Sequence, residues 1–140
     1  GQMKYLTPML GAAGINLVTS FAISQMFEAP PATKEIQGFF DVPFGLEQYL
    51  TLFILIVMLP VIEEWLFRSV LWRFLNKFMS INKTLIAVSL LFAICHVQLP
   101  VVIGLLPFFL GYLRKTQGDI EGSVVAHITH NLVGVLVTLL

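Results

Sequence analysis

Two adjacent carboxylates and an arginine lie inside an apolar run of the chain, at Glu63, Glu64 and Arg68. Ionisable side chains are costly at membrane depth, and they are rare there unless they have a function. A chain that keeps three of them within six positions is therefore expected to use them. They either form a structural ion network or take part in a reaction.

Helix geometry divides these three charges. Glu64 and Arg68 are four residues apart, so they share a helix face and can pair. Glu63 lies about 100° away around the helix and has no such partner on its own helix. A carboxylate in a dry environment is a stronger general base. We therefore expect Glu63 to act as the base and Glu64 with Arg68 to support it.

Histidines on two later segments could complete a site. Phe92 lies one helical turn before His96 and can brace its imidazole. His127 and Asn131 are four residues apart, and both can donate hydrogen bonds to a developing oxyanion. His130 lies beside them. The competing interpretation is that these polar groups only hold membrane helices together.

Together these groups suit hydrolysis of an amide by activated water. An alternative is a zinc site made by Glu63, His96 and His127, because a carboxylate with two imidazoles is a hydrolytic ligand set. The sequence has no HExxH segment to favour it. No serine or cysteine has an obvious base beside it in sequence, and we expect the single Cys95 to be a small core residue of a helix.

The composition predicts that these groups lie in a membrane protein. The 140 residues are 57% hydrophobic and 11% charged, with a mean hydropathy of +0.88. A soluble domain has about 25% charged residues, so this chain could not cover a soluble surface. Its net charge of zero argues against a nucleic-acid partner.

Five apolar stretches predict membrane helices, at about 5–27, 46–78, 84–97, 101–113 and 124–140. The second crosses Pro60, which should kink it, and Pro107 lies inside the fourth. Loops are expected at 28–47 and 114–122, with Ser123 as the N-cap of the last helix. The predicted fold is one all-α membrane domain over 1–140, a polytopic transmembrane helix bundle with some helices short or broken by proline.

The basic residues predict an orientation for this bundle. With the N-terminus inside, Lys34 is the only base outside, which satisfies the positive-inside rule. The bases then on the cytoplasmic side are Lys4, Arg73, Lys77, Lys83, Arg114 and Lys115.

Three motifs carry a resemblance to a known family. The segments 63–68, 92–96 and 127–131 read E-E-x-x-x-R, F-x-x-x-H and H-x-x-x-N in that order. They resemble the CAAX protease and bacteriocin-processing family, also called Abi, of intramembrane proteases, which includes the type II CAAX prenyl endopeptidases. The resemblance covers 61–131, the predicted protease-like core. Ser69 stands where the family often has glycine, and its small size should preserve close helix packing.

The resemblance implies roles for the motif residues. Glu63 and His96 would activate water, and His127 and Asn131 would form the oxyanion hole. The supporting residues would be Glu64, Arg68 and Phe92. We favour the metal-free glutamate mechanism over the zinc alternative, and we interpret His130 as structural.

The predicted function is therefore an intramembrane endopeptidase that cleaves a small peptide or a membrane-associated protein. The alternative is a catalytically silent scaffold or partner-binding protein of the same family, with a self-immunity or regulatory role. Expected partners are the substrate and the lipid bilayer, with a membrane protein as a further candidate. The expected location is a prokaryotic cell membrane, crossed several times, with the site facing the cytoplasm, which argues against a prenylated substrate.

Overall fold

A computed structural model describes residues 3–26, 38–96 and 104–139 of the chain. Within these ranges the fold is all-α, which confirms the predicted membrane helix bundle. The longer helices are α1 (Met3–Met26), a continuous rod over 46–75, α6 (Ile81–Cys95), α8 (Leu105–Gln117) and α9 (Glu121–Thr138). The predicted loop at 28–47 and the start of the predicted fourth span lie partly outside the described residues.

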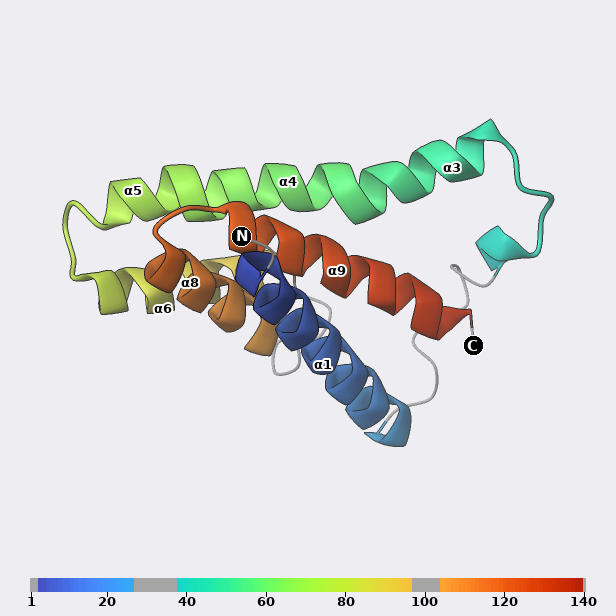
Figure 1. The fold of residues 1–140 in the computed structure, drawn as a ribbon, viewed down its shortest axis with the longest axis horizontal. Coiled ribbons are helices and arrows are strands. Elements are labelled where there is room, and N and C mark those ends of the chain that lie inside the picture. The colour runs from blue at the N-terminus through green and yellow to red at the C-terminus, as the bar shows by residue number, and fades with distance from the viewer. Residues whose placement is uncertain (1–2, 27–37, 97–103, 140) are drawn as a thin grey trace.

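The long rod lies along one side of the bundle, and the other helices pack beneath it (Figure 1). α9 runs next to it, while α1 crosses α9 obliquely. α6 and α8 lie together near the end of the rod that α5 forms. This arrangement brings residues 54–64 of the rod against α9 and residues 65–75 against α6.

The rod is α-helical only in parts. Its successive segments are α3 (Leu46–Phe53), η1 (Ile54–Met58), α4 (Leu59–Glu64), η2 (Trp65–Leu71) and α5 (Trp72–Leu75), of which the two η segments are π-helical. As predicted, the helix continues past Pro60, although it ends at Leu75 rather than near Phe78. Because proline has no N–H, the backbone bonds beside Pro60 cannot follow the regular α-helical pattern, and η1 lies immediately before it.

Two of the helices are long and apolar enough to cross a membrane, among the residues described: Met3–Ser24 and the 30-residue rod Leu46–Leu75. At 1.5 Å per residue the rod is about 45 Å long, which exceeds a hydrocarbon core of about 30 Å. α6, with 15 residues, is shorter but also apolar. α6 and α8 correspond to the third and fourth predicted spans, and both are short, as predicted.

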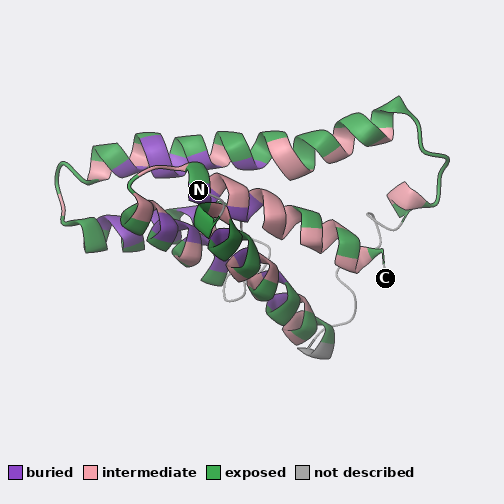
Figure 2. Ribbon diagram, viewed as in Figure 1, coloured by how far each residue is buried: buried purple, intermediate pink, exposed green. Residues whose placement is uncertain are grey.

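Two small apolar cores hold the helices together, and buried residues gather where the rod, α6, α8 and α9 meet (Figure 2). The first core joins α1, α8 and α9 through Ala12, Leu106, Leu110, Leu113 and Ala126. The second joins the rod to α6 through Phe67, Trp72, Leu85, Val88 and Phe92. By contrast, α3 contributes no buried residue.

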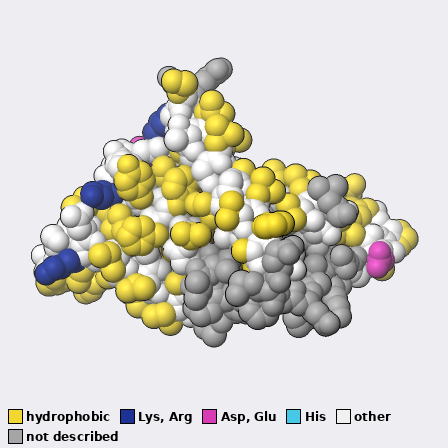
Figure 3. Space-filling view, turned by 90° about the horizontal axis from the view of Figure 1, so that it is seen from below, with side chains coloured by type: hydrophobic (Ala, Val, Ile, Leu, Met, Phe, Trp, Pro, Cys, Tyr) yellow, Lys and Arg dark blue, Asp and Glu magenta, His cyan; other side chains and the backbone are white. Residues whose placement is uncertain are grey.

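Apolar side chains dominate much of the outer surface. Figure 3 shows one face covered largely by apolar groups, with charged side chains near its outline. Large hydrophobic residues such as Phe21, Phe53, Trp65 and Leu90 are more than half exposed. An exposed apolar surface of this extent is expected where lipid rather than water surrounds the helices.

The turn between α8 and α9 corrects two predictions. Residues 114–117, predicted as loop, continue α8, which ends at Gly118 in the left-handed conformation with φ +79°. Glycine adopts this conformation without strain, whereas the residues before it give no reason to stop the helix.

Ser123 does not cap the last helix, which begins at Glu121. The Ser123 hydroxyl donates to the Ile120 carbonyl, while Asp119 accepts the Glu121 N–H at 3.0 Å. Asp119 therefore provides the side-chain acceptor that was predicted for Ser123, since the helix starts three residues earlier. The third helix likewise begins earlier than predicted, at Ile81 rather than at 84.

The prediction that Cys95 is a core residue is wrong, because its side chain is exposed. Phe92, one turn earlier, faces the interior and is only 1% exposed. Cys95 follows by three residues, as the last residue of α6, and its side chain lies at the surface. The thiol therefore makes no packing contribution to either core.

Polar contacts tie α1 to the rest of the bundle. Lys4 pairs with Asp119 at 3.1 Å and with Glu121 at 2.7 Å, and its ammonium holds the pKa of both carboxyls below the ordinary range. Further along, Asn16 donates to the His130 carbonyl at 3.0 Å. This contact joins α1 to α9, as expected if His130 is structural.

Gly111 allows α6 and α8 to approach closely, and a methyl group there should disturb them. A Cβ at Gly111 would lie 3.0 Å from Ser89 Oγ and 3.4 Å from Leu85 Cγ. We expect Gly111→Ala to lower the free energy of unfolding in detergent by about 1–3 kcal/mol. Gly14→Ala is the matched control, because its Cβ meets nothing within 4 Å; it should be neutral or stabilising. Equal effects of the two changes would contradict this packing argument.

Candidate active site

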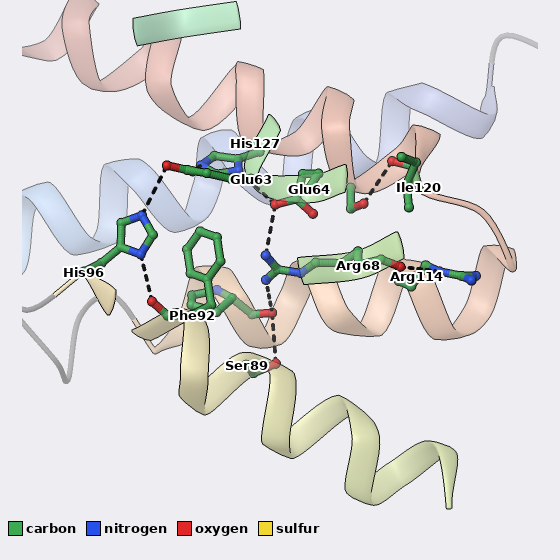
Figure 4. Close-up of polar contacts among 11 residues, drawn as sticks. Glu63, Glu64, Arg68, Ser89, Phe92, His96, Arg114, Ile120 and His127 are labelled. Carbon is green, nitrogen blue, oxygen red and sulfur yellow. Dashed lines mark hydrogen bonds and ion pairs between the residues drawn. The ribbon is translucent and has the colours of Figure 1, made fainter. Parts of the chain in front are cut away.

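The rod, α6 and α9 bring most of the motif residues into one cluster (Figure 4). Glu63 and Glu64 end α4, and Arg68 lies in η2. Phe92 is in the last turn of α6, and His96 is the first residue after that helix. His127 projects from α9. Residues separated by more than 60 positions in the sequence thus meet in the same region.

The predicted pair of Glu64 and Arg68 is confirmed. Arg68 Nη1 donates to Glu64 Oε1 at 3.0 Å, and both side chains are 0% exposed. Arg68 Nη2 also donates to the Pro107 carbonyl of α8 at 3.0 Å. Its guanidinium carbon lies 4.3 Å from the centre of the Phe92 ring, within range of a cation–π contact. The pair is therefore sealed inside the bundle.

Glu64 has a second partner that the sequence did not predict. His127 Nδ1 lies 2.9 Å from Glu64 Oε1. Because a carboxylate can only accept, Nδ1 carries the proton and donates it. Glu64 therefore orients the His127 ring, in addition to neutralising Arg68.

Phe92 braces His96, as predicted. The two rings stack with their centres 4.2 Å apart and their planes at 15°. His96 Nδ1 also lies 2.7 Å from the Phe92 carbonyl oxygen. Since a carbonyl accepts, the proton is on Nδ1, and Nε2 is left to face Glu63.

Both imidazoles present Nε2 to Glu63. His96 Nε2 is 3.5 Å from Glu63 Oε1, and His127 Nε2 is 3.5 Å from Glu63 Oε2. The Glu63 and His96 side chains are 26% and 34% exposed, whereas that of His127 is 5% exposed. Glu63 and His96 thus form the accessible side of the cluster, in contrast to the sealed Glu64 and Arg68.

Asn131 makes a different contact from the one its predicted role requires. Its Nδ2 donates to the Leu55 carbonyl of η1 at 3.0 Å. That carbonyl is free because the Leu59 N–H bonds to Ile54 instead and Pro60 has no N–H. No contact in the described residues joins Asn131 to Glu63, His96 or His127. One N–H of the Asn131 amide therefore donates to Leu55, and the second N–H is left for another acceptor.

The described residues contain no group of three or more His, Cys, Asp or Glu side chains arranged to hold a metal ion. Glu63, His96 and His127, the residues of the zinc alternative, are among the described residues and do not form such a group.

Sequence reasoning missed three residues that support the cluster. Ser89 donates to the Pro107 carbonyl at 3.1 Å, beside the Arg68 guanidinium. Arg114 Nε donates to the Arg68 carbonyl at 2.9 Å. Ser89 gave no signal in the sequence. Pro107 was noted only as a proline inside the fourth predicted span, and Arg114 only as a base that sets membrane orientation.

Comparison with protein families gives a match over more than half of the chain. The model described as "Type II CAAX prenyl endopeptidase Rce1-like" matches residues 45–133. This range includes every residue of the cluster and the predicted core at 61–131, and it leaves α1 outside. Comparison with the curated proteins gives no significant match, and neither does comparison with the solved structures.

Proposed function

Because the chain belongs to the Rce1-like family of type II CAAX prenyl endopeptidases, we propose that it is an intramembrane endopeptidase that uses activated water. The family supports a protease of the CAAX type in a membrane. The observation that carries the mechanism is the contact of one accessible carboxylate, Glu63, with Nε2 of two histidines.

In the proposed reaction Glu63 removes a proton from water as that water attacks the carbonyl carbon of the substrate. A general base must lie within hydrogen-bonding reach of the proton that it takes. Glu63 is the partly exposed carboxylate of the cluster, and His96 Nε2 beside it accepts a second hydrogen bond from the same water. The proton is then delivered to the leaving nitrogen as the C–N bond breaks.

The negative charge on the substrate oxygen needs donors. His127 Nδ1 already donates to Glu64, so Nε2 is a donor when it also carries a proton. Asn131 would contribute the N–H that its bond to Leu55 leaves unused.

The proposed substrate is a small peptide or a membrane-associated protein, and the proposed location is a membrane that the chain crosses several times. The basic residues support an orientation with the site toward the cytoplasm. The family is that of type II CAAX prenyl endopeptidases, which adds prenylated CAAX peptides as a substrate class to test beside unprenylated ones.

The function is tested with the purified protein in lipid vesicles and a panel of such peptides, with products identified by mass spectrometry. His96→Ala is expected to lower cleavage at least about 100-fold, because a group that orders the water is lost. His130→Gln is the control, since His130 contacts Asn16 of α1 and forms no described bond to the cluster. Equal rates for wild type and His96→Ala would contradict the mechanism.

The same purified protein also distinguishes the glutamate mechanism from the zinc mechanism, and an enzyme from a catalytically silent scaffold. Metal analysis of the active protein decides between the glutamate and zinc mechanisms, and tightly bound zinc in a one-to-one ratio would exclude the metal-free one. If the wild-type protein cleaves no peptide of the panel, the catalytically silent scaffold becomes the better account.

A further inference from the structure

The two π-helical segments of the rod lie on either side of α4, the segment that ends in Glu63 and Glu64. In a π-helical segment each N–H bonds to the carbonyl five residues earlier rather than four, which breaks the regular α-helical bonding pattern. Such segments are frequent at functional sites. Each of them here leaves a backbone carbonyl without its α-helical donor.

In η2 the affected carbonyl belongs to Arg68. In an α-helix the Trp72 N–H would donate to it, but here that N–H donates to the carbonyls of Phe67 and Ser69. Arg114 of α8 supplies the missing donor, with Nε 2.9 Å from the Arg68 oxygen (Figure 4). The guanidinium carbon of Arg114 also lies 5.7 Å from the centre of the buried Trp72 ring.

The same arrangement occurs in η1. There the Leu55 carbonyl is left free, and the Asn131 side chain of α9 donates to it. The π-helical segment on each side of α4 is therefore bonded by a side chain from a different helix. Because this occurs twice, we interpret the bonds as a way of fixing the rotation of α4, and not as incidental surface contacts.

We propose that Arg114 is a positioning residue for the cleavage reaction, an inference that rests on the proposed function. Its Nε–H bond fixes the backbone of Arg68, and a continuous set of contacts leads from there to the base. Arg68 bonds to Glu64, Glu64 bonds to His127, and His127 Nε2 faces Glu63. Arg114 itself touches none of the reacting groups.

The side-chain geometry of arginine, glutamine and methionine allows a sharp test. Glutamine places Nε2 at the same position along the side chain as arginine Nε, so Arg114→Gln keeps the N–H donor and loses the charge. Methionine places a methyl group there, so Arg114→Met keeps the length and loses the donor. Arg73→Met is the control for loss of a cation, since Arg73 is an exposed residue of α5 on the same rod.

We expect Arg114→Met to lower kcat by about tenfold to 100-fold, because a small misplacement of catalytic groups has effects of this size. KM should stay close to the wild-type value, since Arg114 does not touch the substrate. Arg114→Gln and Arg73→Met should both keep kcat close to wild type. A fall in Arg114→Gln as large as that in Arg114→Met would overturn the inference, because the charge would then be what matters.

Hydrogen exchange of the backbone gives a readout that needs no substrate. In Arg114→Met the amides of 65–72 should exchange faster than in wild type, while those of α1 should not change, and Arg114→Gln should match wild type. If the amides of 65–72 exchanged at the wild-type rate in Arg114→Met, the inference would be overturned, whatever the activity of that variant. Absence of cleavage by the wild-type protein would overturn the proposed function, and the exchange data would then decide on the backbone contact alone.

Discussion

Replacing Glu63 with glutamine should lower the rate of peptide cleavage at least about 100-fold, the lower range of what a general base contributes. Glutamine has nearly the same shape but cannot take a proton from water. The fold should survive, because Glu63 is partly exposed and its contacts with the two histidines are long, at 3.5 Å each. Cleavage and thermal unfolding should both be measured on protein purified in the same detergent.

Glu47→Gln is the matched control for this experiment. Glu47 is an exposed carboxylate near the start of the same rod, in α3, and its loss should leave cleavage unchanged. If Glu63→Gln retained full activity on an identified substrate, another group would have to be the base. Loss of activity together with loss of folding would show that Glu63 is a structural residue.

Replacing Glu64 with glutamine should instead destabilise the protein, by about 3–5 kcal/mol. The change leaves the Arg68 guanidinium, which is 0% exposed, without its neutralising partner. It also removes the charge that faces His127 Nδ1. The expected result is a lower unfolding temperature and a lower yield of folded protein, in contrast to the intact fold of Glu63→Gln.

A double variant shows whether the unpaired charge is the cause. In Glu64→Gln with Arg68→Met the unpaired guanidinium is gone, and most of the cost of breaking a buried ion pair comes from the charge that is left without a partner. The double variant should therefore be more stable than Glu64→Gln alone, although both lose activity. If the double variant were the less stable of the two, the pairing argument would be wrong.

The sequence could predict contacts that lie within one helix. The bond between Glu64 and Arg68 and the stacking of Phe92 on His96 both follow from four-residue spacing. The all-α membrane bundle follows from composition and apolar stretches. These predictions succeed because they depend on local geometry and on the solvent around the helices.

Contacts between helices could not be predicted in the same way. The bonds from His127 to Glu64, from Arg114 to Arg68 and from Asn131 to Leu55 depend on how helices pack. Carbonyls freed by π-helical segments add a further difficulty, because regular helix spacing assumes that they are already bonded. Bonding between helices was one of the two interpretations of Asn131, but the same assumption hid its partner, the Leu55 carbonyl.

The exposure of Cys95 has a practical consequence for work on this protein. The chain contains one cysteine, and its thiol lies one residue before His96 on the outer side of α6. A thiol reagent that carries a spin label or a fluorophore will therefore attach at a single known position, without the need to remove other cysteines. Since neither apolar core contains that side chain, the label will report on the neighbourhood of His96 in an otherwise unaltered fold.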